Sequence, residues 1–355
     1  MKSSSLLRLT ELELTQTVSL FSESEPIETN EKMASIAAGA GTDTDFRSDS
    51  DDARMISYCR SNQTFLLWHS LKHGRNPNYQ DEETLSSLLH IACQEGNTDC
   101  VDLLLEFKAD PNIVDETGET PLHYACRTGA SECVRCLLKA NADPMCMDEF
   151  DNTPLHYACL SGASECTRLL LAHKDVDVNS TNVGGLTPLY MACQHKGNGI
   201  CPFLLLEKGA NTFISDRQGF TPLAFAAMHG CPAYVSTLLD HGADPNVVDE
   251  YERTPLYMAC RFRNTECIRI LVNHGGVDVN KGDHDGWTPM HEALHNGEYM
   301  MARLLLDKGA DLFKKDESGR MPVDMRQLDK HPAITELLLE YTKVGESKAK
   351  RGRSE

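Results

Sequence analysis

The chain carries the segment Asp115-Glu-Thr-Gly118-Glu-Thr120-Pro121-Leu122-His123-Tyr-Ala125-Cys126 and repeats it in a fixed phase. Its Thr-Pro-Leu core recurs in six copies that begin at Thr120, Thr153, Thr187, Thr221, Thr254 and Thr288, the last with Met290 in place of Leu. Successive copies are 33, 34, 34, 33 and 34 residues apart. A period of this length indicates a repeat protein in which each unit packs only on its neighbours.

Each copy predicts a pair of short helices. Thr120 suits the N-cap of the first helix, and Pro121 suits its first turn, where a missing amide proton is harmless. Leu122, Ala125 and Cys126 then share one helical face by their i, i+3, i+4 spacing. Gly129 ends this helix, and a second helix carries an apolar seam at residues 134–138.

The Thr-Pro-Leu-His-x-Ala unit at this period resembles the ankyrin repeat. The resemblance implies an all-α solenoid with β-hairpin loops, made of about seven regular units plus two caps over residues 53–341. Residues 53–80 are expected to form a degenerate N-terminal cap, and Asp316 to about Tyr341 the C-terminal cap. Residues 1–52 are predicted to be a disordered acidic tail, and residues 342–355 a charged, partly basic tail.

Charge and hydropathy exclude some partner classes. The formal net charge of −19 and pI near 5.1 argue against nucleic acid and anionic membranes. No apolar run approaches the ~18 residues of a membrane helix. Arg8, Glu11 and Glu13 interrupt a brief resemblance to a signal peptide. We therefore expect a cytoplasmic protein; the basic run Lys348–Arg353 leaves a nuclear address as an alternative, although a solvated tail is favoured.

The 14 cysteines are mostly explained by the repeat. Ten occupy two repeat positions: Cys93, Cys126, Cys159, Cys193 and Cys260, and then Cys100, Cys133, Cys166, Cys201 and Cys267. Free cysteine packs as a small apolar side chain, so we expect buried thiols. Cys133 and Cys136 have zinc-ligand spacing, but no second pair faces them, and we predict no metal.

Four histidines, His90, His123, His156 and His291, suggest a metal or catalytic series until their spacing is considered. They lie about one repeat apart, so no two can meet on one atom. The family resemblance implies that this histidine hydrogen-bonds locally and steadies the turns. No phosphate-binding loop, nucleophile elbow or His-Glu-x-x-His motif occurs, so we expect neither an enzyme nor a cofactor.

The resemblance implies that partners bind the concave face formed by hairpin tips and first helices. At the tips it places Phe150, Phe220, Tyr251 and Trp287, and at the helix ends His195, Met228, His229, Arg261 and Phe262. Acidic residues, among them Glu119 and Glu250, favour a protein partner with basic residues around an apolar centre. The alternative is that these aromatic residues pack on neighbouring hairpins.

The predicted function is a non-catalytic, monomeric adaptor or scaffold. A substrate-recruiting subunit of a ubiquitin ligase is the first alternative, because the Cys-rich array is similar to those of the ankyrin and SOCS-box family. That family carries a further elongin-binding box, whereas a polar tail follows Leu339 here. A masking inhibitor of a transcription factor is the second alternative, since an acidic face would suit a basic signal.

Asn179 lies in the sequence Asp177-Val178-Asn179, eight residues after Leu171. This context resembles that of asparaginyl hydroxylation in the ankyrin family, so we predict modification of Asn179. Peptide mass spectrometry of the protein from its own cells should find the Asn179 peptide heavier by one oxygen atom. A peptide recovered only at its unmodified mass would contradict the prediction.

Overall fold

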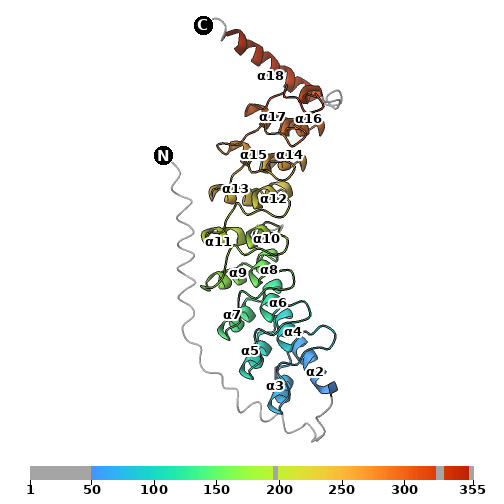
Figure 1. Ribbon diagram of the computed structural model, residues 1–355, viewed down its shortest axis with the longest axis vertical. Coiled ribbons are helices and arrows are strands. Elements are labelled where there is room, and N and C mark those ends of the chain that lie inside the picture. Colours follow the sequence, from blue (N-terminus) through green and yellow to red (C-terminus); the bar gives the residue numbers. More distant parts are fainter. Residues whose placement is uncertain (1–48, 195–198, 325–331, 352–355) are drawn as a thin grey trace. The chain divides into compact units, whose positions relative to one another are not determined.

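The computed structural model describes residues 49–194, 199–324 and 332–351, with backbone alone for residues 49–51 and 342–351. Two rows of helices stack unit upon unit along the chain (Figure 1). The first-helix row consists of α2 (Asp49–Arg60), α4 (Leu88–Gln94), α6 (Pro121–Thr128), α8 (Pro154–Leu160), α10 (Pro188–Gln194), α12 (Pro222–His229), α14 (Pro255–Arg261) and α16 (Pro289–His295). The second-helix row consists of α3 (Thr64–Lys72), α5 (Thr98–Glu106), α7 (Ser131–Lys139), α9 (Ser164–Leu171), α11 (Cys201–Glu207), α13 (Pro232–Asp240), α15 (Thr265–Asn273) and α17 (Tyr299–Asp307). The 3₁₀ turn η2 (Pro322–Asp324) and α18 (Pro332–Arg351) follow.

The all-α solenoid predicted from the sequence is confirmed. Helices α4 to α17 form the regular pairs, and α2 and α3 form the N-terminal cap. Each helix contacts its partner and the neighbouring helices of its own row. The first described helix begins at Asp49, four residues before the expected boundary. At the other end, α18 continues to Arg351 instead of stopping near Tyr341. Lys, Arg, Glu and Ala make up six of the ten residues 342–351 and favour a helix, which offsets poorer helix formers there such as Gly345.

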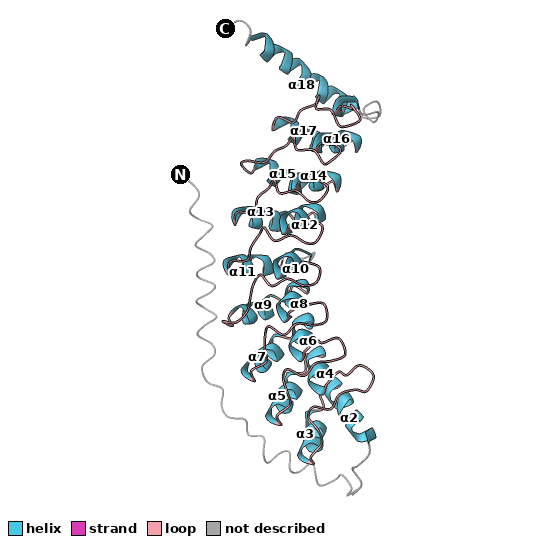
Figure 2. Ribbon diagram, in the orientation of Figure 1, coloured by secondary structure: helices cyan, strands magenta, loops and turns pink. Residues whose placement is uncertain are grey.

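The loops that join the units are tight turns, and Figure 2 shows no strand within the described residues. One isolated antiparallel bridge, Gln80 to Ser87, is the only β pairing there. In the repeated turn, the Asp115 carboxylate accepts hydrogen bonds from the amides of Thr117 and Glu119, at 2.9 and 3.0 Å. The hairpin-like shape predicted for the loops therefore comes from these bonds and from backbone bonds within the turn, such as that from the Asp115 amide to the Glu119 carbonyl at 3.0 Å, instead of paired strands.

The first helix of each unit begins as its sequence predicts. Thr120 has extended backbone (φ −98°, ψ 166°), Pro121 follows in the first turn, and Gly129 ends the helix with a φ of 74°. The His123 ring completes the cap, because its Nδ1 accepts a hydrogen bond from the Thr120 amide at 3.0 Å. Ser87, which replaces Thr in the first regular unit, makes the same cap with His90 at 3.0 Å.

The same histidines join each unit to the next. His123 Nε2 donates to the carbonyl of Asn152, 29 residues later, at 3.1 Å. His90, His156 and His291 make the equivalent bonds, to Glu119, Leu186 and Arg320, at 2.9, 3.0 and 3.2 Å. The structural role expected of the histidine series is confirmed, and it extends beyond the local turn to the neighbouring unit.

In two units a tyrosine makes the bond to the next unit in place of the histidine. Tyr190 and Tyr257 occupy the histidine position, and their hydroxyls donate to the carboxylates of Asp216 and Asp283 in the next unit, each at 2.9 Å. The longer phenol reaches the turn aspartate itself instead of the carbonyl before the next cap. Ala224 fills this position in one unit and makes no such bond, so that joint relies on packing and on other hydrogen bonds, among them those from the Asn264 side chain to the carbonyls of Ala227 and Met228, each at 2.8 Å.

The core is continuous along both rows. Leu122, Ala125 and Cys126 are fully buried, as is Leu137 on the second helix, while Leu138 is half-buried. All ten cysteines in the repeat positions are buried free thiols. Within the described residues, no cysteine belongs to a group with metal-binding geometry, so the Cys133-x-x-Cys136 spacing gains no support as a zinc site. None of the helices described has the length and apolar character needed to span a bilayer.

A ladder of asparagine side chains runs along the loops that follow the second helices. Five of them accept a hydrogen bond from a backbone amide of the next unit at 2.7 or 2.8 Å: Asn78, Asn112, Asn179, Asn246 and Asn280. Met145 occupies this position in one unit, where its sulfur is 3.4 Å from the amide of Asp177. Sulfur is a weak acceptor, so this amide is poorly satisfied.

Replacing Met145 by asparagine should therefore stabilise the protein. The new carbonyl oxygen would accept from the Asp177 amide and restore the ladder, a gain of about 1 kcal/mol in the free energy of unfolding. Urea unfolding of the full chain measures this gain directly. Asn112→Met is the matched control and should cost a similar amount; a Met145→Asn variant no more stable than the parent would contradict this account of the ladder.

Stability should fall between pH 6.5 and 4 because buried histidines must stay neutral. Burial lowers the pKa of His123 and of His156 from 6.5 to about 4, and it also lowers the pKa values of His90 and His291. Between these values the unfolded chain binds more protons than the folded one, so acid favours unfolding, by up to about 3 kcal/mol for each of the first two rings.

Thermal unfolding measured across this pH window tests the expectation. Three carboxylates have lowered pKa values: Asp115, Asp148 and Asp316. Their contribution to the free energy of unfolding is lost only below about pH 3.8, so it can be told apart from that of the histidines. A His123→Gln, His156→Gln variant should be less stable at pH 7, and its stability should change less with pH between 6.5 and 4. Equal slopes in the parent and the variant would show that these rings do not carry the effect.

Candidate protein-binding surface

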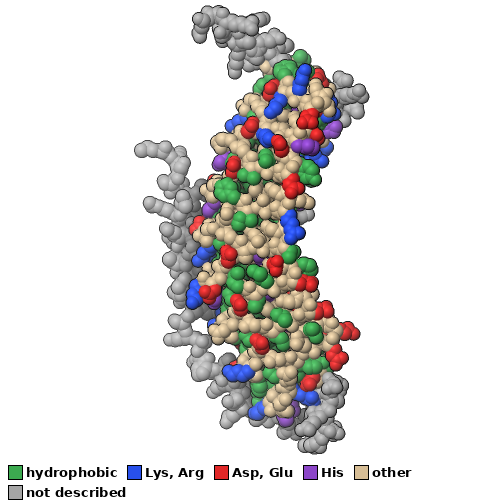
Figure 3. Space-filling model, viewed as in Figure 1, with side chains coloured by type: hydrophobic (Ala, Val, Ile, Leu, Met, Phe, Trp, Pro, Cys, Tyr) green, Lys and Arg blue, Asp and Glu red, His purple; other side chains and the backbone are tan. Residues whose placement is uncertain are grey.

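One face of the array is formed by the inter-unit loops and the exposed sides of the first-helix row, and we call it the loop face. Acidic side chains gather at the edge of this face formed by the loops of the N-terminal units (Figure 3). Two hollows lie on the face, one near each end of the array. Between them lies a small apolar cluster that is separate from the main core.

The apolar cluster consists of five buried side chains, Tyr190, Phe220, Ala224, Tyr257 and Met258. Leu186, Phe225, Met228 and Trp287 pack against it and are partly buried. These residues come from α10, α12, α14 and the turns before α10, α12 and α16, so they repeat the same positions in consecutive units. The central part of the loop face is therefore apolar at its base, with half-buried side chains above it.

The N-terminal hollow measures about 520 Å³, and an arginine of the chain itself forms part of its lining. The Arg127 guanidinium lies over the rings of Tyr124 and Tyr157, at 4.5 and 5.3 Å from their centroids. It also pairs with the Glu119 carboxylate at 2.7 Å. Surface ion pairs ordinarily contribute little to stability, and stacking on the two rings increases the contribution of this one.

The two tyrosines are held by the turn aspartates of their own units. Tyr124 and Tyr157 donate their hydroxyls to Asp115 and Asp148 at 2.8 and 2.7 Å. Burial alone would raise the pKa of each aspartate, but hydrogen bonds from the tyrosine and from the turn outweigh it, so each pKa lies below its usual value. Both carboxylates are therefore charged and fully used within the fold.

The C-terminal hollow measures about 800 Å³ and is lined by Tyr257, Arg261, Asp283, Asp285, Trp287, Glu292, His295, Asn296, Glu317, Ser318 and Arg320. The Trp287 ring stacks on His291 with centroids 4.9 Å apart, and the Arg320 guanidinium lies 5.0 Å from its centroid. Arg320 itself is held by Asp316 at 2.7 Å. The hollow thus combines an aromatic wall with more carboxylates than guanidinium groups.

The structure places the predicted partner-binding residues unequally. Phe150, Tyr251 and Phe262 have about half of their surface exposed, at 51%, 52% and 50%. His229 and Glu250 are exposed, and Met228 is half-buried. Arg261 is half-exposed and lies in the C-terminal hollow. His195 lies outside the described residues.

Two of the expected tip residues, Phe220 and Trp287, need correction because they are not exposed at the tips, and so does the expected acidic residue Glu119. Phe220 is buried in the apolar cluster, since it directly precedes the cap residue Thr221 and points at the first-helix row. Trp287 occupies the same repeat position and is half-buried for the same reason. Glu119 is also at this position, and its carboxylate is buried against Arg127.

Two important residues of the face, Arg127 and Glu292, were missed by sequence reasoning. Arg127 lies seven residues after its cap residue, in the same repeat position as Arg261, so the repeat register could have identified it. Glu292 lies four residues after the cap of its unit. The same position holds apolar or aromatic residues in the other regular units, namely Ile91, Tyr124, Tyr157, Met191, Phe225 and Met258. A carboxylate there breaks the pattern.

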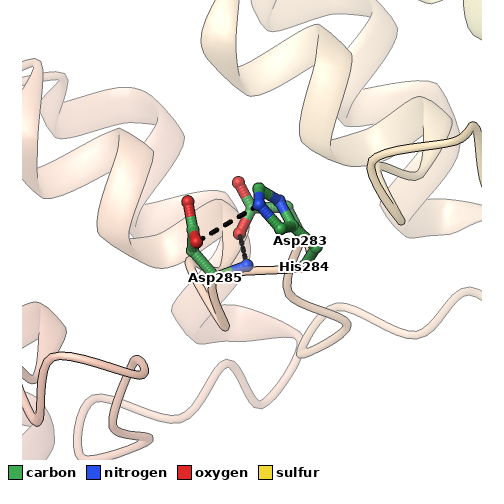
Figure 4. A group of neighbouring side chains, drawn as sticks. All are labelled: Asp283, His284 and Asp285. Carbon is green, nitrogen blue, oxygen red and sulfur yellow. Dashed lines mark hydrogen bonds and ion pairs between the residues drawn. The ribbon is translucent and has the colours of Figure 1, made fainter.

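Three potential metal ligands lie within 4.8 Å of one another in one loop: Asp283, His284 and Asp285 (Figure 4). Asp283 already accepts from the amides of Asp285 and Trp287 and from the hydroxyl of Tyr257. His284 lies 3.3 Å from the Asp285 carboxylate, and both are exposed. These contacts account for the grouping as a loop turn, and it supports no metal site.

Asn179, the predicted hydroxylation site, lies half-buried in its loop. Its side-chain oxygen accepts from the amide of Asn211 at 2.7 Å, and its own amide donates to Asp177 at 2.9 Å. The residue therefore belongs to the asparagine ladder and joins two units.

A family model described as ankyrin repeats (3 copies) matches residues 55–148, 140–216, 185–249 and 223–316. These matches together span most of the 355-residue chain. They cover the second half of α2, all of α3, and every regular helix pair from α4 to α17 with the turn before each first helix.

Similar proteins match over parts of the array. The B-cell lymphoma 3 protein homolog of Mus musculus is 33% identical over 96 residues, which is 26% of this chain and 21% of that protein. Inversin of Canis lupus familiaris is 34% identical over 98 residues, 28% of this chain and 9% of that protein. A putative ankyrin repeat protein of Rickettsia bellii is 31% identical over 112 residues, 31% of this chain and 62% of that protein. The chain thus spans less than two thirds of each relative.

Proposed function

Since the chain belongs to the ankyrin-repeat family, whose arrays are protein-interaction modules, we propose that it is a non-catalytic adaptor or scaffold that binds a protein on its loop face. The observation that carries the proposal is the apolar cluster between two hollows on that one face. Interfaces commonly have an apolar centre and a polar, charged rim.

The exposed side chains on this face support the proposal. Phe150 and Tyr251 project from loop turns and Phe262 from the end of α14, each about half exposed. Aromatic residues dominate the binding energy of protein interfaces because they bury a large area at a small entropic cost. Acidic neighbours such as Glu250, exposed beside Tyr251, favour a partner with basic residues around an apolar centre.

The two alternative functions predict different co-purifying proteins. A ligase subunit would bring down elongin or cullin components together with a substrate. A masking inhibitor would bring down a transcription factor, in a complex that weakens steeply with salt because basic residues pair with the acidic loop face. We further propose a monomer located in the cytoplasm, with a nuclear fraction as the second expectation; microscopy of the tagged protein and its mass in solution test both.

Replacing Phe150, Tyr251 and Phe262 together by alanine should remove most of the partner binding. Each truncation of an interface aromatic typically costs about 1–2 kcal/mol, so the triple variant should bind at least about 100-fold more weakly. Tagged protein purified from its own cells, followed by mass spectrometry of bound proteins and titration of the main partner, measures the loss.

A matched control is available on the other row of helices. Phe203 and Phe213 are exposed to 49% and 58%, and Phe203 lies in α11, away from the loop face. A Phe203→Ala, Phe213→Ala variant should keep its partners. If the control loses them and the loop-face variant retains them, the binding surface is assigned to the wrong side of the array.

A further inference from the structure

Glu292 is the residue of the loop face that the fold explains least. Its repeat position is apolar or aromatic in every other regular unit, and the residue is only 8% exposed. A buried carboxylate costs free energy unless it is paired and well hydrogen-bonded. An apolar residue here, such as the nearly buried Met258 one unit earlier, would stabilise the array more simply.

The internal partners of Glu292 satisfy it incompletely. One oxygen lies 3.1 Å from the Tyr257 hydroxyl, whose single proton is shared with the nearer Asp283 carboxylate at 2.9 Å, and the other accepts from the Asn296 side-chain nitrogen at 3.4 Å. The nearest cation, Arg261, is 3.6 Å away and has half of its side chain exposed. Arg261 also reaches the Tyr257 hydroxyl only at 3.5 Å. The charge of Glu292 is therefore held by long contacts at the wall of an open hollow.

The N-terminal hollow supplies the comparison. There Arg127 lies at 2.7 Å from Glu119 and stacks on two tyrosine rings, so that carboxylate is satisfied within the chain. In the C-terminal hollow the aromatic wall and the carboxylate are present, but no guanidinium of the described residues makes both contacts closely. Arg320 covers Trp287 while pairing with Asp316, and Arg261 approaches Glu292 loosely.

We infer that the C-terminal hollow is a recognition site for an arginine side chain of the partner protein, with Glu292 as its counter-ion and Trp287 as its wall. The inference rests on the proposed function and names the chemistry of one contact within it. A planar guanidinium suits the site because it can pair with a carboxylate through two N–H groups.

Charge in the hollow agrees with this assignment. Asp285 and Glu317 are exposed at its rim, and Asp283 and Glu292 lie deeper, whereas Arg261 and Arg320 are the two guanidinium groups in its lining. Rim carboxylates attract a cation during the encounter, and the buried one determines where it settles. Arg261 holds the place in the free protein and turns outward when the partner's arginine enters.

The test uses a displayed random peptide library of roughly 12 residues, about 40 Å when extended, selected on the folded full chain. Binding of the selected peptides is then measured to the parent and to three variants. Glu292→Gln removes the charge with little change in shape. Arg261→Gln removes the internal competitor. Glu266→Gln, which breaks an exposed ion pair with Arg269 on α15, is the control for a change in net charge alone.

The inference predicts opposite effects for the two hollow variants. The selected peptides should share one arginine. Their affinity should fall at least about tenfold with Glu292→Gln, rise with Arg261→Gln and stay unchanged with Glu266→Gln. Replacing that arginine by citrulline should weaken binding to the parent by the same factor as Glu292→Gln does. On the Glu292→Gln variant the citrulline peptide should bind as well as the arginine peptide. A merely structural Glu292 would instead make both hollow variants bind more weakly, because each breaks the same internal pair.

Two results overturn the inference while leaving the proposed function in place. In the first, the selected peptides bind the loop face without an arginine. In the second, the arginine contributes equally to binding on the parent and on the Glu292→Gln variant. Melting curves confirm that each variant is folded, and Arg261→Gln decides the matter if Glu292→Gln is not. If no selected peptide depends on Phe150, Tyr251 and Phe262, the proposed function itself fails.

Discussion

The structure depends on one recurring bond, in which a side chain near the start of the first helix reaches the backbone or the turn of the next unit in six of the seven regular units. His123 shows it most simply: Nδ1 closes the cap of its own helix, and Nε2 donates to Asn152 of the following unit. One ring thus fixes both where a helix begins and where its neighbour lies. No unit buries enough apolar surface alone, so stability resides largely in these joints and in the seams between helices.

Because the joints and seams use only some positions, the remaining ones are free to vary. The positions four and seven residues after each cap, together with the turn residues, lie on the loop-face side of the first-helix row, where some of them are buried and others exposed. In the middle of the array they carry Met191, Phe225 and Met228, and toward the ends they carry Arg127 and Glu292. The same backbone therefore presents an apolar centre and charged ends without any change in fold.

Most of the fold could be predicted from the sequence, because period and capping chemistry are local signals. Thr120, Pro121 and Gly129 mark the helix ends, and the apolar spacing marks the seam. The site was predicted less well, since exposure depends on which way a residue of the turn points. Phe150 and Phe220 are both aromatic residues of the turn that precedes a first helix, yet the former lies at the tip and the latter is buried one residue before the cap. Pairing across units, such as that of Arg127 with Glu119, requires knowing the register of neighbouring loops in space.

Amide hydrogen exchange of the full chain, with and without its purified partner, tests the account most directly. If the partner lies on the loop face, binding should slow exchange at the turn amides of residues 148–151 and 249–252 and around α16. Exchange along α7, α9, α13 and α15 should stay unchanged. Protection confined to these second-row helices, with the turns unaffected, would contradict the central claim that the loop face is the binding surface.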